Sequence, residues 1–73
     1  MSPPEDRLTQ AERHVREGEG RVAHLAAILA ELEADNHPLA ANQARQVLAT
    51  IRRSLELARD HLRIEREARG IGP

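Results

Sequence analysis

The side chains best suited to metal chemistry are two histidines and two glutamates, divided between the two halves of the chain. Imidazole and carboxylate groups are common ligands of transition metals. The heptad positions predict that His14 and His61 lie near each other, with Glu17 and Glu65 one turn along from them. No local spacing matches a metal-binding signature, so we predict no metal and no cofactor. Metal binding and a pH-sensitive interface both stay open as alternatives for the two histidines.

Ser54 and Thr50 are candidate nucleophiles, and His61 is the candidate base for either of them. The chain has no cysteine nucleophile and no glycine-rich phosphate-binding loop after a strand. A solvated pair of helices offers neither an enclosed pocket nor an oxyanion site. We therefore predict that the protein is not an enzyme.

Length and composition set bounds on the class of protein. The 73 residues allow one small domain, spanning residues 1–73. The longest apolar run, residues 25–30, is too short to cross a membrane, and no secretory signal is visible. We therefore predict a cytoplasmic protein with no membrane partner. The chain lacks Cys, Phe, Tyr and Trp, so it has no disulfide and none of the aromatic platforms that single-strand nucleic-acid binders use.

Two sets of apolar or small residues recur at alternating spacings of three and four, which is the heptad pattern of a helix seam. Folding the chain back at residues 35–38 pairs each member of the first set with one of the second, for example Leu25 with Leu48. The sequence therefore predicts an all-α fold, an antiparallel two-helix hairpin of the coiled-coil type. The first set is Leu8, Ala11, Val15, Gly18, Val22, Leu25, Leu29 and Leu32, and the second is Ala41, Ala44, Leu48, Ile51, Leu55, Ala58, Leu62 and Glu65.

Capping signals predict where the first helix begins. We expect this helix over residues 9–34, with Thr9 as its N-cap and Glu12 completing a capping box. A second capping box at residues 2–5 competes with it. Residues 1–7 are therefore expected to be frayed or loosely helical.

Turn residues predict the remaining boundaries. We expect a turn over residues 35–38 and a second helix over residues 39–69. Asn36 tolerates the left-handed backbone that follows a helix, and Pro38 suits the first turn of the next one. Gly70 is a natural stop, with Ile71 placed to fold back against the helix.

Two glycines interrupt the first helix, and each costs about 1 kcal/mol relative to alanine. Gly18 lies on the seam opposite Leu55, where a missing side chain makes room for a large one. Gly20 faces outward and has no packing reason. A kink or hinge at Gly20 stays open.

Charged residues follow one flank of the seam. Glutamates of the first helix face arginines of the second across this flank, so we expect them to favour the antiparallel orientation, although each exposed ion pair is worth only about 0–1 kcal/mol. The first-helix positions are Glu12, Glu19, Ala26 and Glu33, and the second-helix positions are Arg45, Arg52, Arg59 and Arg66.

Further apolar residues lie on the opposite flank, outside the intrachain seam. Two helices bury only one stripe each, and so small a core seldom folds alone. We therefore predict that a second copy covers this surface in a twofold dimer, a four-helix bundle with the second helix at its centre. Another protein partner, a higher assembly and a monomer on which Leu57 and Ile64 are scattered exposed side chains stay alternatives. The predicted dimer interface is Ile28, Val47, Leu57, Ile64 and His61.

The arginine-rich end of the second helix leaves one alternative function open. Small dimeric hairpins bind folded RNA by shape, but here acidic residues interleave with the arginines. We therefore predict a non-enzymatic protein–protein interaction or regulatory module acting as a homodimeric helical bundle, with a small dimeric RNA-binding regulator as the alternative. The arginines concerned are Arg52, Arg53, Arg59, Arg63, Arg66 and Arg69.

Three segments carry a resemblance, namely residues 11–19 (AERHVxEGE), 32–37 (LEADxH) and 54–62 (SLxLxxxHL). Together they resemble small uncharacterised helical-hairpin proteins encoded in GC-rich proteobacterial genomes, over residues 9–66. This resemblance implies the hairpin architecture but no activity and no site residues. In architecture alone, the chain is also similar to the Rop family of dimeric RNA-binding hairpins.

Overall fold

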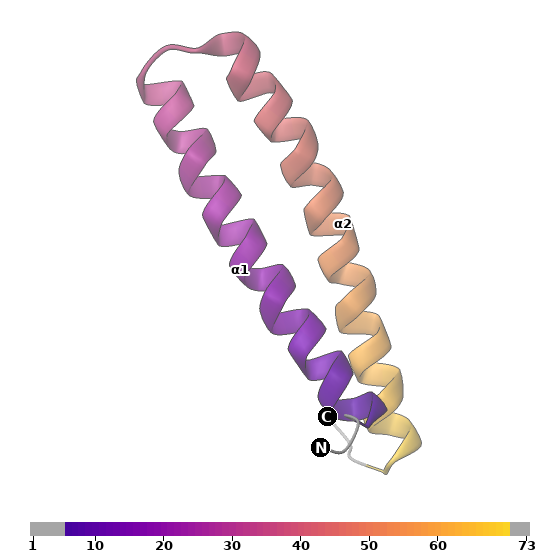
Figure 1. Ribbon diagram of the computed structural model, residues 1–73. Coiled ribbons are helices and arrows are strands. Elements are labelled where there is room, and N and C mark those ends of the chain that lie inside the picture. Colours follow the sequence, from indigo (N-terminus) through magenta and orange to yellow (C-terminus); the bar gives the residue numbers. More distant parts are fainter. Residues whose placement is uncertain (1–5, 71–73) are drawn as a thin grey trace.

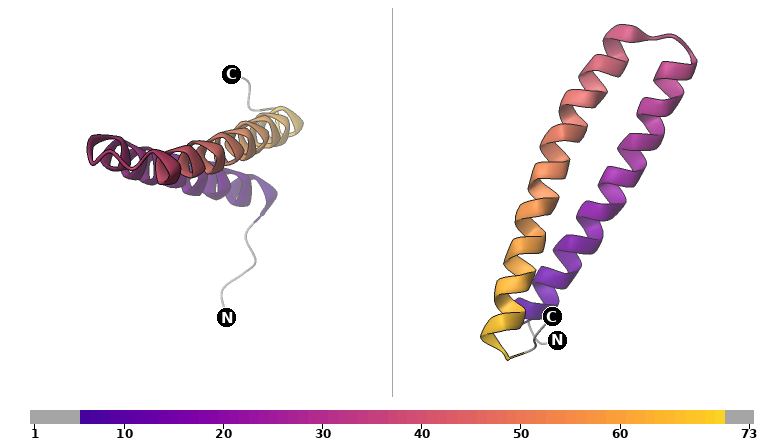
Figure 2. Two further views of the ribbon diagram at one scale, coloured as in Figure 1. Left: turned by 90° about the horizontal axis from the view of Figure 1, so that it is seen from above. Right: turned by 180° about the vertical axis from the view of Figure 1, so that it is seen from behind.

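The protein forms two long helices that run side by side in opposite directions. The computed structural model describes residues 6–70, in which α1 spans Arg7–Ala34 and α2 spans Pro38–Ala68 (Figure 1). The start of α1 lies beside the end of α2, and two further views show the same pairing (Figure 2). Residues 6–70 contain no strand. This confirms the predicted all-α class and the packing of the two helices into a hairpin.

A Schellman motif ends α1. The Asn36 N–H donates to the carbonyl of Glu33, and the His37 N–H donates to the carbonyl of Leu32 at 2.9 Å. These are the bonds that satisfy the last carbonyls of a helix when the next residue is left-handed, and Asn36 has φ 58°, as its position predicted. Pro38 is the first residue of α2, where its missing N–H costs no helical hydrogen bond.

A left-handed glycine follows α2. Gly70 has φ +75°, and its N–H donates to the carbonyl of Glu67 at 3.0 Å. The helix ends at Ala68, one residue earlier than predicted, and it begins one residue earlier, at Pro38. The predicted contact of Ile71 lies outside the described residues.

The N-cap of α1 is Asp6, so the prediction of Thr9 as the cap is wrong. The N–H of Thr9 donates to Oδ1 of Asp6 at 2.8 Å, and the helix begins at Arg7. Thr9 lies within the first turn, because Asp6 already offers a side-chain acceptor three residues before it. The competing capping box at residues 2–5 lies outside the described residues.

Asp6 gives the hairpin an acid-sensitive end. The hydrogen bond from the Thr9 N–H is the largest of the effects that lower the pKa of Asp6, and Arg69, whose Nη1 lies 3.7 Å from Oδ2 of Asp6, lowers it further. Because the folded pKa is depressed, the stabilisation is present above the unfolded pKa of about 3.9 and is lost as the pH falls through the folded value.

We therefore predict that Asp6→Asn, which keeps the capping oxygen and removes the charge, makes the melting temperature less dependent on pH in the acid range. Thermal unfolding followed by circular dichroism between about pH 2 and pH 5 compares the two proteins. The melting temperature of the wild type should fall further than that of Asp6→Asn across this range. Equal falls would contradict the role of the Asp6 charge.

The core between the helices is thin. All sixteen positions of the two predicted sets are buried or half-buried, but three of the five fully buried hydrophobic residues are alanines. Leu48 and Leu55 are the only large ones among them, within residues 6–70. The remaining seam leucines, isoleucine and valines stay half-buried. The buried positions are Ala11, Gly18, Ala41, Ala44, Leu48 and Leu55.

Ion pairs join the helices along the predicted flank. Nη2 of Arg45 lies 3.1 Å from Oε2 of Glu33, and Nη2 of Arg59 lies 3.4 Å from Oε2 of Glu19. No ion pair joins Glu12 to Arg66 in the described part of the chain. These side chains are about half exposed, so each pair is worth about 0–1 kcal/mol and contributes to orientation more than to stability.

Candidate functional site

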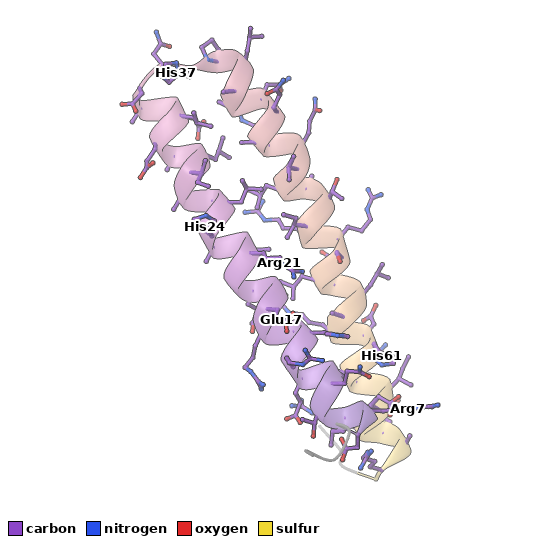
Figure 3. All side chains as sticks on the ribbon, in the orientation of Figure 1. Arg7, Glu17, Arg21, His24, His37 and His61 are labelled. Carbon is purple, nitrogen blue, oxygen red and sulfur yellow. The ribbon has the colours of Figure 1, made fainter. Side chains whose placement is uncertain are left out.

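The two histidines with candidate metal chemistry lie in different surroundings. His14 borders a hollow between the helices together with Glu17 and Ser54. His61 lies toward the end of α2 (Figure 3), with its Nε2 3.8 Å from Oε1 of Glu65 on the same helix. Residues 6–70 contain no group of three or more His, Asp, Glu or Cys side chains placed to hold a metal ion. The structure therefore does not bring the four predicted candidates into one site.

The hollow beside Gly18 is partly open to solvent. It is lined by four residues from each helix, and Ser54 is its one hydroxyl group. His61 does not line it, and the Thr50 hydroxyl donates to the backbone carbonyl of Gln46 at 3.2 Å. The nucleophile and base considered from the sequence are thus not assembled. The lining residues are His14, Glu17, Gly18, Arg21, Ile51, Ser54, Leu55 and Ala58.

Several arginines of α2 already contact carboxylates. Arg45 and Arg59 pair with glutamates of α1, and Arg63 lies 3.8 Å from Asp60. Beyond α2, Arg69 pairs with Asp6. A phosphate backbone would have to compete with these carboxylates, so the geometry gives the RNA-binding alternative no specific support.

Large apolar side chains are exposed along α2. Leu57 is 64 % exposed, Ile64 is 56 % exposed and Val47 is 50 % exposed. Ile28, the predicted interface residue on α1, is half-buried, and the His61 side chain is exposed. Sequence reasoning missed Leu39, which is 82 % exposed. The exposure of Leu39 could have been predicted from its position, because it directly follows Pro38 and lies outside the predicted seam.

Val47, Leu57 and Ile64 belong to a second heptad stripe, which we call the α2 stripe. Eight of its nine members directly precede a seam residue and Ala68 continues the same spacing, so the stripe is rotated from the seam by about 100° around the helix. All ten charged residues of α2 lie off the stripe, and eight of its nine members are exposed. The α2 stripe consists of Ala40, Gln43, Val47, Thr50, Ser54, Leu57, His61, Ile64 and Ala68.

The hairpin exposes more surface than a globular protein of its mass. A compact monomer of 8.2 kDa exposes about 4,500 Å², whereas this chain exposes 5748 Å². Its radius of gyration is 16.2 Å, compared with about 11 Å for a compact domain of this length. The excess area, about 1,200 Å², exceeds the roughly 800 Å² that each partner contributes to a standard protein interface.

No protein-family model matches this chain, and no curated protein or solved structure is significantly similar to it. The predicted resemblance to proteobacterial hairpin proteins therefore stays a prediction. Neither helix within residues 6–70 has the length and apolar character needed to span a membrane.

Proposed function

We propose that this protein is a non-enzymatic protein–protein interaction module that acts as a homodimeric four-helix bundle. The α2 stripe is its self-association surface. The observation that supports this proposal is the absence of charge along a solvent-exposed stripe that runs the length of α2, on a helix that carries ten charged residues elsewhere. A solvated helix face normally carries charged and polar residues.

The geometry of the stripe fits a four-helix bundle. In such a bundle each helix packs against two neighbours at roughly right angles around its axis. On α2, the seam toward α1 and the α2 stripe are about 100° apart. The seam packs against α1, and the α2 stripe packs against a helix of a second copy.

The thin intrachain core supplies the energetic reason for assembly. Removing Val47, Leu57 and Ile64 from water contributes about 1.5–3 kcal/mol for each fully buried side chain, in each copy. This gain offsets the translational and rotational entropy lost on association. Because every copy carries the same stripe, the required partner is present wherever the protein is made.

Light scattering after size exclusion tests the proposal. We predict a mass of 16.4 kDa, twice the 8.2 kDa of one chain, and a melting temperature that rises with protein concentration, because dimerisation stabilises by mass action. A mass of 8.2 kDa with a concentration-independent melting temperature would contradict it. The cytoplasmic location expected from the sequence stays a prediction.

A further inference from the structure

The charges of α1 indicate how a second copy is oriented. One row of α1, which we call the α1 edge, lies on the same side of the hairpin as the α2 stripe, because His14, Glu17 and Arg21 share the hollow with Ser54. Figure 3 shows Arg7, Glu17, Arg21 and His24 in order along this helix. The α1 edge consists of Arg7, Gln10, His14, Glu17, Arg21, His24, Ile28 and Glu31.

The α1 edge is complementary to itself when reversed. Its four charges alternate along the helix as Arg7, Glu17, Arg21 and Glu31. Laid antiparallel against an identical edge, Glu17 faces Arg21 and Arg7 faces Glu31, while His14 faces His24 and Gln10 faces Ile28. Every charged residue then meets one of opposite sign.

From this complementarity, and resting on the proposed homodimer, we propose that the two copies pack face to face about a twofold axis perpendicular to the helices. α1 then lies antiparallel against α1 of the second copy, and α2 lies against α2. The centre of the assembly holds two Glu17–Arg21 pairs, and each outer end of the α1 contact holds an Arg7–Glu31 pair. The same face therefore combines an uncharged contact with a charge-matched one.

The α2 stripe is compatible with the same axis. Its antiparallel pairing sets Val47 against Ile64, Thr50 against His61 and Ser54 against Leu57, each from the other copy. Leu57 then meets a small side chain at the border of the hollow beside Gly18. The centres of the α1 and α2 pairings lie within about 2 Å of each other along the hairpin at 1.5 Å per residue.

The other face-to-face arrangement lacks this match. A twofold axis parallel to the helices places the α1 edge over the α2 stripe of the second copy. Arg7 and Glu31 would then lose water against an uncharged surface, and Glu17 and Arg21 would keep only their contacts within α1. Loss of water without a new partner is costly for charged groups. Charge complementarity therefore favours the arrangement that pairs α1 with α1 and α2 with α2, because unmatched charges destabilise the one that pairs α1 with α2.

The proposed Glu17–Arg21 pairs between the two copies can be tested by exchanging their charges. Arg21→Glu gives a copy with two acidic groups at the centre of the face, and Glu17→Arg gives a copy with two basic ones. We expect each variant alone to dimerise about 10-fold more weakly than the wild type, because exposed charge pairs are individually weak. Mixed in equal amounts, the two variants should form a heterodimer well above its statistical share, measured by native mass spectrometry. The double variant Glu17→Arg/Arg21→Glu should recover wild-type dimerisation.

A matched pair of variants controls for charge placed elsewhere on α1. Ala23→Arg and Ala30→Glu add opposite charges at exposed positions outside the α1 edge, and their mixture should give only the statistical share of heterodimer. The contacts of Glu17 with Arg13 and Arg21 of its own helix are altered identically in homodimer and heterodimer, so they do not create a preference.

The two proposals fail in different ways. A dimeric wild type whose Arg21→Glu and Glu17→Arg variants mix without preference would overturn the antiparallel orientation and leave the homodimer standing. A wild type that stays monomeric would overturn the homodimer itself, and the orientation with it.

Discussion

Replacing Leu57 and Ile64 together with glutamate should abolish dimerisation. The Leu57→Glu/Ile64→Glu variant removes four apolar side chains from the assembled interface, two from each copy, and places four carboxylates there. Burial of the exposed part of each side chain is worth about 1 kcal/mol, so the dimer dissociation constant should rise at least about 1,000-fold. Light scattering should give 8.2 kDa, the mass of one chain.

The same variant should also lose helix. The intrachain core has only two fully buried leucines within the described residues, so separated hairpins are expected to be marginally stable. Circular dichroism at about 222 nm should therefore show a lower helical signal and a broader thermal transition than in the wild type. An unchanged mass would exclude the α2 stripe as the self-association surface.

A double variant on the far side of α2 serves as the control. Asn42→Glu/Ala49→Glu adds the same two negative charges to the same helix, at exposed positions that belong neither to the seam nor to the α2 stripe. It should keep the dimeric mass and most of the thermal stability. Loss of dimerisation in this control as well would indicate an effect of net charge rather than of the stripe.

Valine at Gly18 should destabilise the hairpin strongly, whereas valine at Gly20 should not. A Cβ at Gly18 would lie 3.0 Å from Cδ1 of Leu55, while a Cβ at Gly20 has nothing within 4 Å. Valine is stiff at χ1 and cannot turn away from the neighbouring helix. Overpacking of this kind costs about 1–3 kcal/mol, and the displaced Leu55 is one of the two fully buried leucines.

Thermal unfolding of the two variants measures the difference. Gly20→Val should gain a few tenths of a kcal/mol from helix propensity. Gly18→Val should melt about 4–24 °C below the wild type, at 4–8 °C per kcal/mol. The two substitutions are chemically identical and lie two residues apart on one helix. Equal melting temperatures would show that Gly18 is not required for the close approach of Leu55.

The predicted seam could be read from the sequence because its period is a local property of the helix. Alternating spacings of three and four place side chains on one face whatever the neighbours are, and the structure buries or half-buries all sixteen positions. The turn was equally readable, since Asn36 is among the few residue types that adopt a left-handed backbone at little cost. Gly18 was correctly set against Leu55.

The start of α1 and the surroundings of the histidines were not readable in this way. Asp6 and Thr9 are both good caps locally, and Arg69, which contacts Asp6, comes from the other end of the chain. His14 and His61 share a heptad position, but side chains lean toward the N-terminus of their own helix. The stagger of the two helices therefore sets His14 beside Ser54 and leaves His61 near Glu65.

The sequence by itself determined the two helices, their antiparallel pairing and the residues between them, because each follows from a period or a backbone preference within a few residues. Only the tertiary structure decided which of the facing charges form ion pairs, how thin the core is and which apolar side chains stay in water. The seam pairing predicted the register of the two helices, but their separation and the conformations of their side chains depend on contacts between segments distant in sequence, which no local pattern encodes. The α2 stripe could be read from the sequence as a pattern, but its exposure is a property of the folded hairpin.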